Sequence, residues 1–128
     1  MKHNVLITGA SGGIGAAISR KLAEDQHNLI LCYHKNESAA QKIAVQCAEK
    51  GSHCLLKQAD FCCENQIKAL IEDVHNQIGP IDILINNAGI SYWGLLQDMT
   101  AEEWDTLFAV NVRSFFLTAK YILPSMIH

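Results

Sequence analysis

The chain has 128 residues, of which 49% are hydrophobic and 18% are charged, and its formal net charge at pH 7 is −3. This length fits one domain with a packed core, which excludes intrinsic disorder, and the acidic balance disfavours a nucleic-acid partner. No apolar run approaches the roughly 20 residues of a membrane-spanning helix, and the charged, glycine-containing residues 1–25 do not form a signal peptide. We therefore expect neither a nucleic acid nor a membrane as partner.

The first predicted element is a short apolar strand at residues 5–7, which leads directly into a glycine-rich turn at residues 8–15. Apolar residues at positions 14, 17, 18 and 22 then recur at helical spacing. They predict a helix over residues 13–25, with Arg20 and Lys21 on its outer face. The order is strand, glycine turn, helix.

The glycine turn has the composition of an anion-binding site. Gly9 can take backbone angles that a side chain forbids, Gly13 leaves space for a ligand, and Gly15 allows the helix to pack closely on the strand. The free N–H groups and the positive dipole end of the new helix suit a pyrophosphate, and Thr8 and Ser11 can add hydroxyl hydrogen bonds. The alternative is a tight turn without a ligand, because the spacing Gly-x-x-x-Gly-x-Gly is not the common dinucleotide spacing.

The rest of the chain alternates between helix and strand. The predicted elements are a buried strand at residues 29–33, a helix at 40–51, a strand at 54–59, a helix at 67–78 and a strand at 81–85. Gly79 and Pro80 end the second of these helices. After a turn at residues 86–89, Thr100 and Glu103 form a capping box, which starts a helical segment that runs toward Pro124 with a bend near Asn111.

Strands that alternate with helices predict right-handed crossovers and a parallel sheet. The expected fold is α/β: a Rossmann-type doubly wound sheet with strand order 3-2-1-4, formed by residues 1–128 as a single dinucleotide-binding domain that stops before a fifth strand. Ligands of such sheets bind beyond the C-terminal strand ends, where the strand order reverses. The glycine turn and the turn at residues 86–89 both reach that point, which predicts a nucleotide-binding crevice.

The five cysteines form no Cys-x-x-Cys pair, and the six histidines form no ligand cluster. Cys32 and Cys47 fall on predicted apolar faces, where cysteine behaves as a small hydrophobic residue. We expect reduced structural thiols in a cytoplasmic protein, the alternative being a metal or disulfide framework.

Four motifs in this order resemble the short-chain dehydrogenase/reductase family over the whole chain. They are the glycine turn at residues 8–15, Asp60 after the third strand, the Asn-Asn-Ala-Gly run at residues 86–89, and Asn111 within the last helical segment. Within the family, the chain is most similar to reductases of 3-oxoacyl groups on acyl-carrier protein or of the 5-aminopentanone modification of elongation factor P. The motifs do not separate these two branches.

The resemblance implies roles for single residues. Asp60 would accept a hydrogen bond from the adenine amino group beside the Phe61 backbone, although a helix N-cap is an alternative role. Asn111 would be the asparagine of the catalytic tetrad, which holds a water next to the active-site lysine; the alternative is a polar residue that bends a helix. The predicted cofactor-binding residues are Thr8, Gly9, Ser11, Gly12, Gly13, Ile14, Gly15, His34, Lys35, Asp60, Phe61, Asn87, Ala88 and Gly89.

The residues after the second strand favour NADP over NAD. An acidic residue there would hold the ribose hydroxyls of NAD and repel a 2′-phosphate. Tyr33 occupies that place, and His34 and Lys35 follow it, so the rim is neutral or positive. One departure from the family pattern is Gly12, where NADP-dependent members often carry a basic residue. An ordinary solvated loop is the alternative for His34 and Lys35.

The family's catalytic serine, tyrosine and lysine have no match here. Tyr121 has Ser125 four residues later, where the family has a lysine, and it lies on a different helix from the family's tyrosine. The strand at residues 81–85 would also leave a bare apolar sheet edge, and the last helix exposes residues that in this family often pack against a second subunit. We therefore expect an N-terminal part of a longer reductase, and a homo-oligomer at full length.

Two functions follow from these observations. The first is an NADP-dependent oxidoreductase that reduces a ketone of 3-oxoacyl type, either a small molecule or bound to an acyl carrier, and of which this chain is the cofactor-binding half. On this hypothesis the 128-residue chain alone reduces no ketone. The second is a nucleotide-binding module or partner subunit without catalysis.

Overall fold

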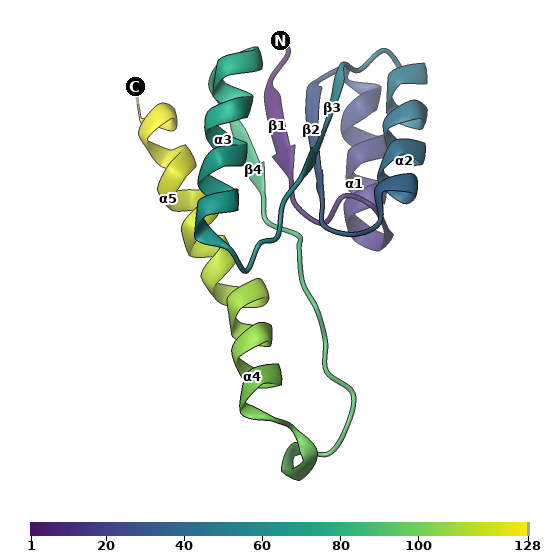
Figure 1. The fold of residues 1–128 in the computed structure, drawn as a ribbon. Helices are drawn as coiled ribbons and strands as arrows, with labels where there is room; N and C mark the ends of the chain where they lie inside the picture. Colours follow the sequence, from purple (N-terminus) through teal and green to yellow (C-terminus); the bar gives the residue numbers. More distant parts are fainter. Residues whose placement is uncertain (128) are drawn as a thin grey trace.

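The computed structural model describes residues 1–127 and contains a parallel four-stranded sheet. Its strands are β1 (Asn4–Ile7), β2 (Asn28–Tyr33), β3 (Cys54–Gln58) and β4 (Ile83–Ile85), in the order β3-β2-β1-β4. β1 lies in the middle, with Val5 level with Leu29 on one side and with Ile83 on the other. The predicted fold class and strand order are confirmed, although β4 begins two residues later than predicted (Figure 1).

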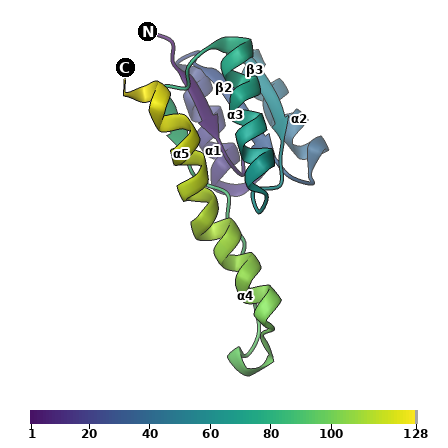
Figure 2. The ribbon, with the colours of Figure 1, turned by 60° about the vertical axis from the view of Figure 1, so that its left-hand side comes forward.

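Helices cover both faces of the sheet. α1 (Gly13–Glu24) and α2 (Glu37–Glu49) lie on one face, whereas α3 (Glu64–Ile78) and α5 (Ser114–Met126) lie on the other (Figures 1 and 2). Between β4 and α5 the chain leaves the sheet as an arm (residues 91–108), which contains a 3-10 turn at Leu96–Asp98 and helix α4 (Ala101–Phe108). A π-helical turn at Ala109–Arg113 joins α4 to α5.

The core consists of two apolar layers, one on each side of the central strands. Successive strand residues point to opposite faces, so the continuous apolar runs of β1 and β2 serve both layers. Leu6 and Ile30 pack toward α3 and α5, whereas Val5, Ile7 and Leu31 pack toward α1 and α2, and all five side chains are fully buried. The run in β2 was predicted as a buried strand, and its burial confirms the prediction.

The predicted apolar face of α1 is wrong. Ile14 is 71% exposed, and the side chains that the helix buries are small: Gly15, Ala16, Ser19 and Ala23. Small residues let the helix axis approach the sheet, while Leu22 packs only at its side. Arg20, predicted on the outer face, is half-buried and its guanidinium lies 3.5 Å from the side-chain oxygen of Gln46 on α2.

The start of α4 agrees with the sequence. The Thr100 hydroxyl accepts a hydrogen bond from the Glu103 N–H at 3.1 Å, and the Glu103 carboxylate accepts one from the Thr100 N–H at 2.9 Å. Asn111 lies in the π-helical turn, at the position where the sequence predicted a bend. Within residues 1–127, no helix combines the length and apolarity needed to cross a membrane.

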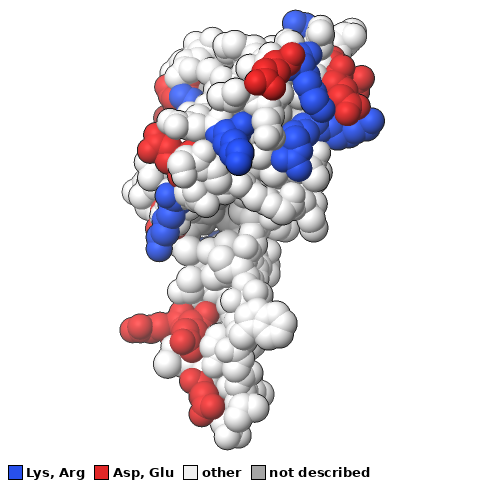
Figure 3. Space-filling view, turned by 90° about the vertical axis from the view of Figure 1, so that its right-hand side faces the viewer, with Lys and Arg blue, Asp and Glu red and all other residues white. Residues whose placement is uncertain are grey.

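Charge is distributed differently over the sheet domain and the arm. On the side of α1 and α2, Lys and Arg are interspersed with Asp and Glu (Figure 3). The arm carries only acidic charges, Asp98, Glu102, Glu103 and Asp105. An anionic ligand therefore finds cationic groups beside the sheet and not along the arm.

Candidate cofactor site

The ends of β1 and β4 meet at the point where the strand order reverses (Figure 1). Thr8 directly follows β1, and its hydroxyl accepts hydrogen bonds from the backbone N–H groups of Asn87 and Ala88, both at 2.9 Å. In return, the Asn87 side-chain amide donates to the Gly9 carbonyl at 3.1 Å. The two turns predicted to converge are thus joined by direct hydrogen bonds.

Gly9 and Gly15 are needed for this close approach. Gly9 has φ of +64°, and a Cβ atom there would lie 2.9 Å from Cα of Ala88. A Cβ atom on Gly15 would lie only 2.2 Å from the Gly9 carbonyl oxygen. The sequence predicted positive φ at Gly9 and close packing at Gly15, and both are confirmed.

The start of α1 offers space and positive potential. No heavy atom lies within 4 Å of an ideal Cβ on Gly12 or on Gly13. The first turn of α1 contains no acidic residue, and its N-cap, Gly12, supplies no side chain to the first N–H groups. A phosphate placed here would meet unshielded helix N–H groups and the positive dipole end. Ile14 is exposed beside this point, and Ser11 is half-buried.

A cavity of about 370 Å³ extends from the glycine turn across the ends of β2 and β3. Its lining residues are Gly9, Ser11, Tyr33, His34, Lys35, Asn36, Asp60, Phe61, Ala88, Gly89, Ile90 and Val110. Eight of the predicted cofactor-binding residues are therefore in this wall. The other four lining residues are Tyr33, which sequence analysis placed after the second strand without predicting that it binds cofactor, and Asn36, Ile90 and Val110, which it missed. Asn36 alone carried a signal, because an Asn directly before a helix is typical of an N-cap.

The rim after β2 is fixed by two polar side chains. Asn36 caps α2 by accepting a hydrogen bond from the Ala39 N–H at 3.2 Å. The Gln58 side-chain amide, at the end of β3, donates to the His34 carbonyl at 3.0 Å. His34 and Lys35 are exposed, so the imidazole of His34 and the ammonium of Lys35 remain available to a ligand in the cavity.

Asp60 stands at the far wall of the cavity. Its carboxylate accepts a hydrogen bond from the Cys62 N–H at 2.9 Å, and its own N–H donates to the Gln66 side chain at 2.8 Å. The N-cap of α3 is Cys63, so the helix N-cap that was considered for Asp60 is wrong. Burial and the neighbouring Asp60 carboxylate raise the pKa of the Cys62 thiol, which keeps this thiol neutral beside the cavity.

Asn111 lies on the π-helical turn, and both ends of its amide are used. Its Oδ1 accepts a hydrogen bond from the Ile90 N–H, and its Nδ2 donates to the Ile90 carbonyl, each at 2.8 Å. The side chain thereby pairs with the backbone of Ile90, which directly follows residues 86–89. A polar residue that bends a helix and a residue that shapes the site are both consistent with this geometry.

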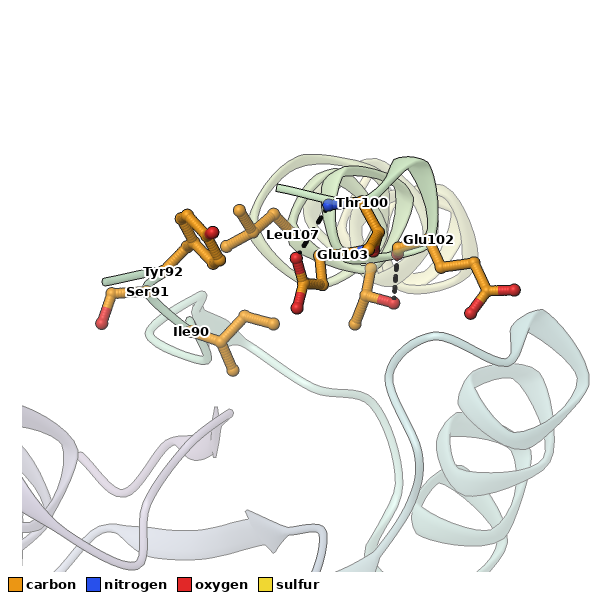
Figure 4. Close-up of a pocket in the computed structure, with 8 residues that line it drawn as sticks. Ile90, Ser91, Tyr92, Thr100, Glu102, Glu103 and Leu107 are labelled. Carbon is orange, nitrogen blue, oxygen red and sulfur yellow. Dashed lines mark hydrogen bonds between the residues drawn. The ribbon is translucent and has the colours of Figure 1, made fainter. Parts of the chain in front are cut away.

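A second cavity, of about 500 Å³, lies between residues 90–92 and α4 (Figure 4). Ile90, Tyr92 and Leu107 supply its apolar wall, and Glu103 is engaged in the capping box with Thr100. It adjoins the first cavity, because Ile90 lines both. A reactant next to the cofactor crevice would have space here.

Tyr121 lies outside both cavities. Its hydroxyl donates a hydrogen bond to Glu64 on α3 at 2.6 Å, and this bond raises the pKa of Tyr121. A general acid at neutral pH needs a lowered tyrosine pKa, so the shift has the wrong direction for catalysis. Among residues 1–127, no three His, Cys, Asp or Glu side chains gather into a metal site.

A doubly wound parallel sheet with a glycine turn at its switch point defines a Rossmann-type nucleotide-binding domain. The family model described as short chain dehydrogenase matches residues 3–128, and the chain belongs to this family.

Relatives with known names and structures agree with this membership. The chain is 33% identical over 127 residues to 3-oxoacyl-[acyl-carrier-protein] reductase of Staphylococcus epidermidis, covering 99% of this chain and 52% of the relative. It is 36% identical over 115 residues to versicolorin reductase 1 of Aspergillus parasiticus, covering 90% and 44%. A metagenomic short-chain oxidoreductase in complex with NADP superposes with a TM-score of 0.93 at 32% identity, covering 98% and 57%. The chain thus spans about half the length of the curated relatives it matches.

Proposed function

We propose that the chain binds NADP and forms the cofactor half of a short-chain reductase that acts on a ketone of 3-oxoacyl type. The observation that carries the cofactor choice is the rim after β2, where Tyr33, His34 and Lys35 line the cavity without an acidic residue. A carboxylate at this position would repel a 2′-phosphate, whereas a cation attracts it. The structural relative that holds NADP and the reductase names among the sequence relatives point the same way.

The residues of the crevice fit the parts of a dinucleotide. Gly12 and Gly13 would hold the pyrophosphate at the start of α1, and His34 and Lys35 would hold the 2′-phosphate. The Asp60 carboxylate would accept a hydrogen bond from the adenine amino group. The bound cofactor would supply a hydride to the carbonyl carbon, and the cavity between residues 90–92 and α4 would receive the ketone.

Among the described residues, no tyrosine is followed four residues later by a lysine, the pair that in this family supplies the proton. Tyr121 is directed to Glu64 and carries a raised pKa, and Ser125 stands where a partner lysine would be needed. Asn111 would belong to the proton pathway, by the resemblance of its motif. We therefore expect the 128-residue chain to bind cofactor without reducing a ketone.

An apolar stripe that runs from α4 over the π-helical turn onto α5 would serve association. It consists of Trp104, Phe108, Val112 and Phe116, which recur every four residues and are 50%, 47%, 56% and 61% exposed. Trp104 and Phe108 stack with their ring centroids 4.7 Å apart. An exposed apolar row of this kind marks an interface, and we assign it to a second copy of the chain.

Titration of the chain with NADPH and with NADH tests the cofactor choice. We expect NADPH to bind more tightly, and Lys35→Glu to weaken NADPH binding about tenfold while changing NADH binding much less, because a charge-assisted hydrogen bond is worth about 1.5–3 kcal/mol. Lys42→Glu is the matched control, since Lys42 is an exposed lysine on α2 outside the cavity. Equal losses for both cofactors in Lys35→Glu, or tighter NADH binding by the unmodified chain, would refute the assignment.

A further inference from the structure

The segment after β4 lies along the helix that follows the arm. Residues 86–90 run in the opposite direction to the π-helical turn and the start of α5, with Asn86 opposite Thr118 and Ile90 opposite Asn111. The two polar contacts thus join the first and last residues of this loop segment to the helical residues 111–118.

The contact at Asn111 belongs to a motif, but the contact at Thr118 does not. Thr118 is 1% exposed, and its hydroxyl donates to Oδ1 of Asn86 at 2.8 Å. The same hydroxyl lies 2.9 Å from the Ser114 carbonyl and 3.1 Å from the Phe115 carbonyl. A helical threonine satisfies its hydroxyl by such bonds to the preceding turn. The hydroxyl has a single proton, which these three oxygens share, and the Asn86 oxygen is the nearest of them.

We propose that Thr118 is a positioning residue for the cofactor crevice, which acts through Asn86 on the segment Asn87–Gly89. Asn86 precedes the two residues whose N–H groups bond to Thr8, and Ala88 and Gly89 line the crevice. With Asn86 held by α5 and Ile90 held by Asn111, the segment between them is fixed at both ends. Without the Thr118 hydroxyl, only the bonds to Thr8 and Gly9 would hold its first half.

Hydrogen exchange of the Asn87 and Ala88 amides tests the proposal without a ligand. Thr118→Ser and Thr118→Ala differ by one hydroxyl group, and Thr118→Val preserves the side-chain volume. We expect these amides to exchange about two- to tenfold faster in Thr118→Ala and Thr118→Val than in Thr118→Ser, the range that one hydrogen bond gives. Rates are divided by that of the Ile30 amide in β2, which reports opening of the sheet.

Thr106→Val is the control variant, because the Thr106 hydroxyl makes the same bond to its preceding turn, at 2.9 Å to the Glu102 carbonyl, and is exposed on the arm. It should leave the exchange of Asn87 and Ala88 unchanged. Equal rates in Thr118→Ser and Thr118→Ala would overturn the proposal, as would an equal acceleration in Thr106→Val.

NADPH affinity gives a second measurement, which rests on the proposed function. Thr118→Val should weaken binding about two- to tenfold, and Thr118→Ser should stay within about twofold of the unmodified chain. Failure of the unmodified chain to bind NADPH would refute the cofactor assignment, and the amide exchange would still decide the role of Thr118. Faster exchange in Thr118→Val with unchanged NADPH affinity would overturn the claim that this contact serves the crevice.

Discussion

Gly15→Ala tests whether the glycine turn is constrained by the protein or only by its ligand. Inside a helix, Gly→Ala normally stabilises by about 0.8–1 kcal/mol. At Gly15 the added Cβ would lie 2.2 Å from the Gly9 carbonyl oxygen and 2.6 Å from the Asn87 amide nitrogen. Backbone at Gly9 cannot turn away as a side chain could, so α1 must shift outward. Overpacking of this kind costs about 1–3 kcal/mol.

The expected net effect is a loss of stability of about 1–3 kcal/mol, which for a chain of this size lowers Tm by about 4–11 °C. Urea unfolding followed by circular dichroism measures it, with Gly12→Ala as the control, because φ of Gly12 is −163° and nothing lies within 4 Å of its Cβ position. Gly12→Ala should stay within about 0.5 kcal/mol of the parent. A Gly15→Ala variant as stable as Gly12→Ala would refute the packing argument.

Two further predictions concern a buried thiol and the apolar stripe. Burial raises the pKa of Cys32 from its ordinary 9.0 to about 12, so above pH 9 the unfolded chain ionises while the folded chain stays neutral. The free energy of unfolding should therefore fall from pH 9 toward pH 12, and it should fall less steeply in Cys32→Ala. Urea unfolding midpoints across this pH range measure the effect. Labelling of Cys32 by iodoacetamide in the native chain as fast as in the unfolded chain would contradict the burial. Phe116→Glu should shift the sedimentation velocity of the chain toward monomer, whereas Val45→Glu, an equally exposed apolar site on α2, should not; identical profiles for both variants would remove the stripe from the interface.

The fold could be predicted from the sequence because its signals are local. Continuous apolar runs at β1 and β2, the capping box at Thr100 and the Gly79–Pro80 stop each depend on a few neighbouring residues, and alternation of strand and helix then leaves one sheet order. The face of α1 failed for the opposite reason. The rotation of the helix is set by the close approach of Gly15 to Gly9 and Asn87, and Asn87 is far from the helix in the sequence.

Only those site residues that belong to a recognisable motif or follow a predicted strand could be predicted from the sequence. Asp60, Ala88 and Lys35 line the cavity as predicted, because strand ends of a parallel sheet meet at one edge. Val110 and Ile90 reach the same cavity through the π-helical turn and its pairing with Asn111, and no apolar period encodes that geometry. Thr118 was missed because its hydrogen-bond partner, Asn86, lies 32 positions away, and the sequence around Thr118 gives no sign of this contact.

The four glycines of the turn have two different roles. Gly9 and Gly15 face Ala88, Asn87 and each other, so their missing side chains are required by contacts within the protein. Gly12 and Gly13 face open space, so no contact within the protein requires either to be small, although the φ of +56° at Gly13 favours glycine there. What they leave free is the room above the first N–H groups of α1, where an anion gains most from the helix. Substitution at Gly9 or Gly15 should therefore reduce stability first and cofactor affinity as a consequence. At Gly12, a side chain should reduce cofactor affinity while the unfolding midpoint stays in place.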